Sequence, residues 1–114
     1  MLFRSVSNAA AIAAVDGIDA VFVGPNDLAH AMGHGNDWKA PDVAAAIEQT
    51  LRAVQAQGKC GGIIALSPDD ERRYGEFGAR YFATVATSVI TQAFRQAAQG
   101  GPTAADASAP ALRY

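Results

Sequence analysis

The sequence has no strong excess of charge of either sign, and it has no long hydrophobic run. Its 114 residues include nine Lys or Arg and eleven Asp or Glu, for a net charge of −2. The basic residues are scattered and form no basic face, which argues against a nucleic-acid partner. The longest apolar runs, such as residues 63–66, are far shorter than the ~20 residues that a membrane-spanning helix needs. Because 50% of the residues are hydrophobic and 18% charged, we expect one globular domain.

The chain also has little cysteine and no recognisable targeting segment. Cys60 is the single cysteine, so it can form no intrachain disulfide, and it lacks the spacing of a zinc site. Residues 1–4 are too few for a signal peptide with its charged, apolar and cleavage regions. These features predict a cytoplasmic protein.

Three short segments are apolar at nearly every position, namely residues 20–23, 61–66 and 81–87. The first stops at Gly24-Pro25 and the second at Ser67-Pro68. A strand that is exposed on one face alternates apolar and polar residues, whereas these segments do not. They therefore predict strands buried on both faces, as in a parallel sheet.

Helical patterns separate these strands. The clearest begins at Pro41 and ends before Gly58, with an apolar stripe at Val43, Ile47, Leu51 and Val54. Further helices are expected over residues 7–15, 67–77 and 88–99, the second opened by a capping-box spacing of Ser67 and Asp70. Strict alternation of strands and helices predicts right-handed βαβ units and a parallel sheet. Residues 101–114 have no apolar period and are predicted to be a disordered tail.

The end of the first strand carries the most informative polar residues. In parallel α/β folds, ligands bind beyond the carboxyl ends of the strands. Asp27 follows the first strand closely, and the backbone amides of Asn26 and Asp27 lie beside it. A carboxylate beside free amides can hold a hard cation and an anionic substrate together. The same residues also make a good turn and helix cap, and the pattern alone favours that simpler interpretation.

Other chemically active side chains give weaker signals. His30 and His34 are four residues apart, but Gly33 and Gly35 break the helix that would bring them together, and no third ligand is near. Lys59 precedes its strand and so belongs to the amino end of the sheet, away from the expected site. We therefore expect neither a histidine metal site nor lysine-imine chemistry.

The sequence resembles the HpcH/HpaI family of class II aldolases, which act on 4-hydroxy-2-oxoheptanedioate and 2-keto-3-deoxy sugar acids. The resemblance is carried by residues 18–28, IDAVFVGPNDL, which are followed by Met32-Gly33. It extends over about residues 5–99. The further matching positions are Pro41-Asp42-Val43, Gly58-Lys59, Gly62-Ile63, Arg73-Tyr74 and Gly78-Ala79.

The resemblance implies a TIM (β/α)₈ barrel, which typically has roughly 250 residues, so this α/β chain would be its C-terminal portion. About three βα units with a preceding helix would be present. The implied division is a non-native or truncated start over residues 1–6, a partial barrel domain over 7–100 and the tail over 101–114. Family members are homo-oligomers, hexamers in which C-terminal helices are exchanged. Three strands of an eight-stranded barrel leave open edges, so we expect the isolated chain to associate or aggregate.

The resemblance also implies the site residues. Asp27 would be a ligand of Mg²⁺ or Mn²⁺, the amides of Asn26 and Asp27 would hold the carboxylate of pyruvate, and Ile64 would form a hydrophobic wall near the aldehyde side. The second metal ligand of the family, a Glu, would fall at Met1. The substrate-clamping Arg and the His–Asp pair for proton transfer belong to strands that precede this segment. No catalytic residue is therefore expected in this chain, which we predict to be inactive alone.

The implied activity of the parent is cleavage of 4-hydroxy-2-oxo acids to pyruvate and an aldehyde. One alternative is a fragment of a citrate-lyase β or malyl-CoA-lyase type of C–C lyase, which predicts CoA-binding basic residues upstream. Another is a non-catalytic α/β binding module of the flavodoxin type. That fold needs about five strands and an acidic or phosphate-binding cluster after the first, and only three strands are predicted here.

Overall fold

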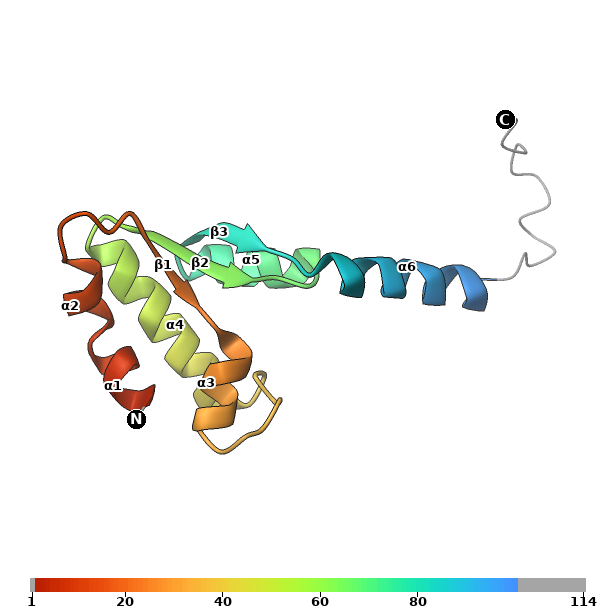
Figure 1. Cartoon of the computed structure of the whole chain (residues 1–114), viewed down its shortest axis with the longest axis horizontal. Coiled ribbons are helices and arrows are strands. Elements are labelled where there is room, and N and C mark those ends of the chain that lie inside the picture. Colours follow the sequence, from red (N-terminus) through yellow and green to blue (C-terminus); the bar gives the residue numbers. More distant parts are fainter. Residues whose placement is uncertain (1, 101–114) are drawn as a thin grey trace. The chain divides into compact units, whose positions relative to one another are not determined.

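The computed structural model describes residues 2–100 and forms two units, Met1–Thr84 and Val85–Tyr114, which are described separately (Figure 1). The predicted tail over residues 101–114 lies outside the described part. The first unit contains α1 (Leu2–Ser7), α2 (Ala9–Ala13), β1 (Ala20–Val23), α3 (Pro25–Ala31), α4 (Pro41–Ala56), β2 (Cys60–Ile64), α5 (Pro68–Glu76) and β3 (Ala79–Ala83). In the second unit, the described residues form α6 (Ala86–Gln99). No helix in residues 2–100 has the length and apolar character that crossing a membrane requires.

The three strands form one parallel sheet in the order β1-β2-β3. The pairs Ala20–Cys60 and Val23–Ile63 mark the ends of the β1–β2 ladder. Between β2 and β3 the register shifts after Gly61, which pairs with Ala79, whereas Gly62 pairs with Tyr81. The predicted alternation of helices with parallel strands is therefore confirmed.

Most predicted elements differ by a residue or two at their ends, and two differ more. The expected helix over residues 7–15 is shorter, α2 (Ala9–Ala13), and a second short helix, α1 (Leu2–Ser7), precedes it, with Asn8 between the two. The third strand is Ala79–Ala83 instead of residues 81–87, because Gly78 turns with φ +100° and the chain pairs with β2 directly after it. Residues 84 and 85 therefore connect β3 to α6, and residues 86 and 87 form the start of that helix.

The core lies between α4 and one face of the sheet. Val43, Ile47 and Leu51 of the predicted α4 stripe are fully buried there, and so is Ile63 on β2. Val54, the fourth residue of the stripe, is also fully buried. Gly61 allows this close packing, since a Cβ at that position would lie 3.0 Å from Cδ2 of Leu51. At ~25 cal/mol per Å² of apolar area removed from water, burial of this kind is the main stabilising contribution to the unit.

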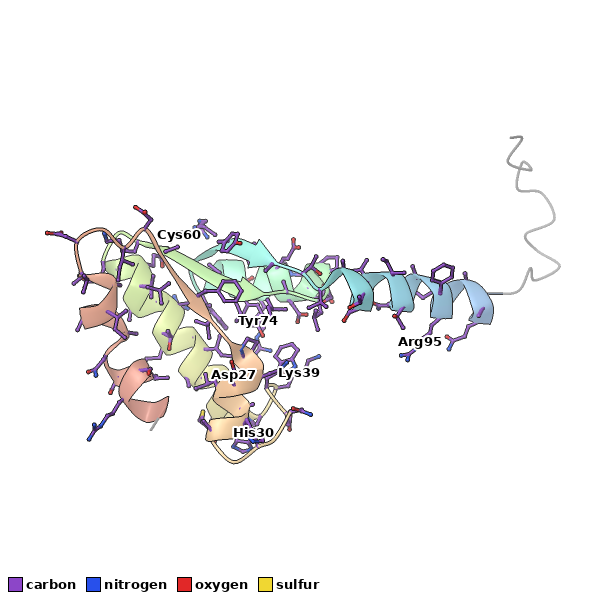
Figure 2. The ribbon with its side chains drawn as sticks, viewed as in Figure 1. Asp27, His30, Lys39, Cys60, Tyr74 and Arg95 are labelled. Atoms are coloured by element: carbon purple, nitrogen blue, oxygen red, sulfur yellow. The ribbon has the colours of Figure 1, made fainter. Side chains whose placement is uncertain are left out.

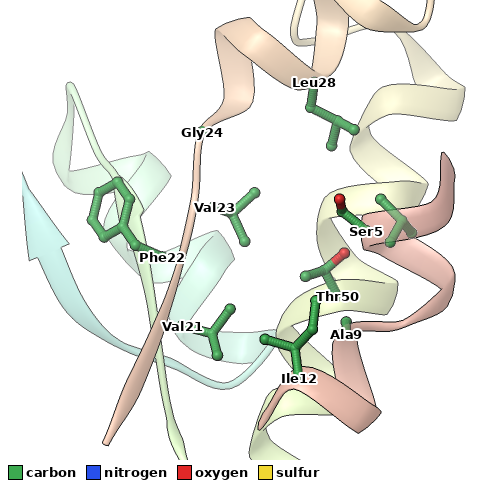
Figure 3. A pocket seen from close by; sticks show the side chains of 10 residues that line it. Ser5, Ala9, Ile12, Val21, Phe22, Val23, Gly24, Leu28 and Thr50 are labelled. Atoms are coloured by element: carbon green, nitrogen blue, oxygen red, sulfur yellow. The ribbon is translucent and has the colours of Figure 1, made fainter. Parts of the chain in front are cut away.

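The opposite face of the sheet is much less buried, so the prediction of strands buried on both faces is wrong for this unit. Phe22 on β1 is 44% exposed and Tyr81 on β3 is 54% exposed. Their rings meet edge to face, with centroids 5.8 Å apart, on either side of Gly62. Figure 3 shows Phe22 pointing to the opposite side of β1 from Val21 and Val23. Successive side chains of a strand point to opposite faces of the sheet. The helices of this unit cover only the face on which α4 lies.

Candidate functional site

The candidate site is the junction between β1 and α3. The strand ends at Val23, Gly24 is the N-cap, and Pro25 begins α3 with the backbone angle that a first helical position needs. The first helical hydrogen bond runs from the amide of Leu28 to the carbonyl of Gly24, at 3.0 Å. The amides of Asn26 and Asp27 precede this bond, so the helix itself provides no acceptor for them.

Asp27 lies in this first turn with its side chain exposed (Figure 2). Its carboxylate folds back towards the end of the strand, because Oδ2 lies 3.2 Å from the point that a Cβ of Gly24 would occupy. The ion pairs of the described residues, His34–Asp42, Arg52–Glu48 and Arg72–Asp69, do not involve it. Within residues 2–100 there is no group of three His, Cys, Asp or Glu side chains that could hold a metal. The described residues thus offer one carboxylate at the end of β1 and not a complete metal site.

Ile64 ends β2 at the same edge of the sheet. It is one residue beyond the Val23–Ile63 pair, as Gly24 is on β1, and it is partly buried. Its register partner on β3 is Ala83. The fold therefore places Asn26, Asp27 and Ile64 at one carboxyl edge of the sheet.

The two histidines do not act together. His30 is exposed on α3, whereas Nε2 of His34 lies 2.7 Å from Oδ2 of Asp42 in the first turn of α4. The glycines on both sides of His34 have positive φ, +84° at Gly33 and +58° at Gly35, and they turn the chain away from α3. The hydrogen bond from His34 holds the pKa of the Asp42 carboxyl below its usual value. Sequence reasoning missed this pair, although a histidine shortly before a first-turn acid was a usable signal.

A cavity of about 250 Å³ lies between the N-terminal helices and β1 (Figure 3). Sequence reasoning gave no sign of it. Its walls are mostly apolar and include Val6, Ala9, Ile12, Val21, Leu28 and Thr50. The hydroxyl of Thr50 already donates to the carbonyl of Ala46, at 2.8 Å. The cavity therefore suits packing by apolar groups better than recognition of a polar substrate.

Comparison with known proteins identifies the family. The family model for HpcH/HpaI aldolase/citrate lyase matches residues 3–93, which is most of the chain. The chain belongs to this family. The helices and parallel strands of this chain correspond to part of the family's TIM-barrel structures, so the predicted fold class is confirmed. A flavodoxin-type binding module is accordingly disfavoured.

Two curated relatives of this chain are named as aldolases. It is 42% identical over 116 residues to a hydroxypyruvate/pyruvate aldolase of Delftia acidovorans, covering 96% of this chain and 42% of the relative. It is 46% identical over 80 residues to a 5-keto-4-deoxy-D-glucarate aldolase of Escherichia coli, covering 70% of this chain and 31% of the relative. A solved structure of a family member from Burkholderia cenocepacia J2315 superposes with a TM-score of 0.77 at 39% identity, over 84% of this chain and 38% of that one.

The chain thus spans less than half the length of the curated relatives that it matches. The larger part of each of those relatives therefore has no counterpart in this chain.

Proposed function

We propose that this chain is the C-terminal portion of a divalent-metal-dependent class II aldolase that cleaves 4-hydroxy-2-oxo acids to pyruvate and an aldehyde. The observation that carries the proposal is the placement of the Asp27 carboxylate at the carboxyl end of β1, beside the amides of the first turn of α3. In barrel enzymes, residues at this end of the strands perform the chemistry.

Asp27 fits the role of a ligand for Mg²⁺ or Mn²⁺. Both are hard cations that prefer carboxylate oxygens, and Asp27 is an exposed carboxylate outside the ion pairs of the described residues. One carboxylate is not a sufficient site, so the remaining ligands would come from residues of the parent enzyme. When bound, such a metal supplies Lewis-acid stabilisation of the negative charge that C–C cleavage leaves on pyruvate.

The other site residues would bind and orient the substrate. The amides of Asn26 and Asp27 would donate hydrogen bonds to the carboxylate of a small 2-oxo acid, which the positive end of α3 also favours. Ile64 would present an apolar side chain to the aldehyde side of the site. No proton-transfer residue is proposed within this chain, so the isolated chain should show no aldolase turnover.

The alternative of a citrate-lyase β or malyl-CoA-lyase type of enzyme shares the family name. The relatives with 42% and 46% identity are both aldolases, which favours the pyruvate-aldolase proposal. We further propose that the parent is a homo-oligomer, a hexamer by resemblance to the family, with residues 7–100 as part of its barrel domain.

The proposal is tested in a chimera in which residues 3–93 replace the matching segment of the Delftia acidovorans aldolase. We expect the chimera to release pyruvate from a 4-hydroxy-2-oxo acid in a metal-dependent way. Asp27→Asn should lower kcat/KM by about a hundredfold or more, because it removes an anionic oxygen from a hard-cation site. The melting temperature of the metal-free protein should fall only slightly, because the charge of Asp27 in the first turn of α3 contributes about 0.3–1 kcal/mol through the helix dipole.

Asp16→Asn is the matched control, since Asp16 is exposed and lies before β1, away from the carboxyl edge. It should leave both measurements unchanged. Near-normal metal-dependent activity of the Asp27→Asn chimera would exclude Asp27 as a metal ligand and leave it a role in the turn alone.

A further inference from the structure

Gly24 does not need to be glycine for its backbone conformation. Its angles, φ −91° and ψ 96°, are ordinary extended values that any L-residue adopts. Among residues 2–100, the glycines that have a positive φ lie elsewhere, at positions 17, 33, 35, 58 and 78. A different reason must explain the absence of a side chain at the end of β1.

The space that a side chain of Gly24 would need is occupied by Asp27. The three nearest atoms to a Cβ at this position would be Oδ2 of Asp27 at 3.2 Å, its Cβ at 3.7 Å and its Cγ at 3.8 Å. The last two distances are ordinary van der Waals contacts. The first is shorter than a normal contact of a Cβ atom, so the neighbouring atom would have to move by a few tenths of an ångström. The atom that would be displaced is therefore the carboxylate oxygen itself.

We infer that Gly24 is a positioning residue for the Asp27 carboxylate, which it allows to fold back over the carboxyl end of β1. The inference rests on the proposed function, in which that carboxylate binds a metal. With an alanine at position 24, the carboxylate would turn outwards, away from the strand end.

The displacement would fall on the side chain of Asp27 because the rest of α3 is fixed. Pro25, Leu28 and Ala29 are buried, the last two within the hydrophobic core. The backbone can therefore yield little, while the exposed carboxylate is free to rotate. A metal ligand must be held within about 0.5 Å of its productive position, so a small rotation affects binding without affecting the fold.

A purely structural role for Gly24 predicts something different. If the glycine mattered only for folding, its replacement would change stability and leave the orientation of Asp27 and the metal affinity as they were. Gly75 offers a matched control in the same chain. It lies inside α5, and a Cβ there would have no neighbouring atom within 4 Å.

The first experiment uses NMR of the 114-residue chain with selectively ¹³C,¹⁵N-labelled Gly and Asp. The wild-type chain should show NOE cross-peaks between the Hα protons of Gly24 and the Hβ protons of Asp27. Gly24→Ala should change the Hα–Hβ couplings of Asp27, which report its side-chain rotamer, whereas Gly75→Ala should not. Absence of the wild-type NOE, or unchanged couplings in Gly24→Ala, would overturn the inference. The NOE needs no variant, so the contact between Gly24 and Asp27 can be tested even if Gly24→Ala folds poorly.

The second experiment measures Mn²⁺ affinity by EPR in the chimera described above. Gly24→Ala should weaken Mn²⁺ binding by about tenfold, the low end of the loss seen when groups that orient a metal ligand are altered. Gly75→Ala should leave the affinity unchanged. Equal affinity of the wild-type and Gly24→Ala chimeras would overturn the inference. A chimera that binds no Mn²⁺ while the chain still shows the NOE would instead refute the metal role of Asp27 and leave the contact with Gly24 intact.

Discussion

The two faces of the sheet are built from the same three strands but are very different in packing. On the face towards α4, Val23, Ile63 and Ala79 are buried beneath the apolar stripe of that helix. On the other face, Phe22 and Tyr81 are each about half exposed on either side of Gly62. Adjacent residues of one strand thus differ in burial, because their side chains point to opposite faces of the sheet.

The difference in packing indicates that the two faces contribute unequally to the stability of the chain. The face that α4 covers provides the stability that holds the carboxyl edge in place. In the family's barrels the strands close on themselves, so the open face corresponds to the interior of a closed barrel. We expect substitutions on the covered face to act through stability, and those on the open face to have smaller effects in this chain.

The largest effect is expected from Ile47→Ala on the covered face. Ile47 is fully buried in α4 against the sheet, and truncating such a side chain typically costs about 2–5 kcal/mol, through lost transfer free energy and the cavity left behind. Urea denaturation followed by circular dichroism would measure the loss. Leu66→Ala is the control, because Leu66 is exposed, and it should cost well under half as much. Equal losses would show that α4 does not form the core.

A pair of neighbouring glycines offers a direct test of the two faces. An alanine at position 61 would place its Cβ 3.0 Å from Cδ2 of Leu51, and one at position 62 would place it 2.7 Å from Phe22 and 2.8 Å from Tyr81. Overpacking typically costs about 1–3 kcal/mol. We expect Gly61→Ala to be the more destabilising despite its longer contact, because Leu51 is enclosed while the two rings can turn into solvent.

Chemical denaturation of both glycine variants would rank them, with Gly75→Ala as a reference. Gly75 is an interior helical position with free space around it, so alanine there should stabilise the chain by roughly 1 kcal/mol. If Gly62→Ala lost more stability than Gly61→Ala, the open face would be more rigid than its exposure indicates.

Local sequence patterns were enough to predict much of this fold. The residues of β1 were predicted with the bounds that the structure has, since the apolar run stops at a Gly-Pro pair. The stripe of α4 followed from the helical period alone, and Ser67 caps α5 by accepting a hydrogen bond from the amide of Asp70, as its spacing predicted. Each of these features depends on residues that are close in sequence.

The errors arose where the outcome depends on distant residues. A strand of apolar residues has the same sequence pattern whether other elements cover both faces of its sheet or only one. The exposure of Phe22 and Tyr81 could therefore not be predicted from the sequence. The pairing of His34 with Asp42 depends on how two glycines turn the loop. At the candidate site, the sequence predicted that Asp27 follows a strand, but the approach of its carboxylate to Gly24 required the three-dimensional structure.

The smallest predicted effect concerns the link between His34 and Asp42, which joins the α3–α4 loop to the start of α4. The pair tests whether polar contacts at the surface add to the stability that the covered face provides. Because the hydrogen bond from His34 lowers the pKa of Asp42 in the folded chain below its ordinary value of 3.8, its contribution is present above that pH. It should be lost as the pH falls below about 4 and through the folded-state pKa.

The melting temperatures of the wild-type chain and Asp42→Asn, measured between about pH 2 and pH 6 by circular dichroism, would test this. The wild type should be slightly more stable at the upper end, and the difference should shrink towards the acidic end. Asp16→Asn, which alters an exposed carboxylate outside the ion pairs of the described residues, should show no such convergence. Because Asp42 is exposed, solvent screens the interaction and the shift should be small beside that of Ile47→Ala. A difference that persists unchanged at the lowest pH would mean that Asp42 stabilises α4 by a means other than its charge.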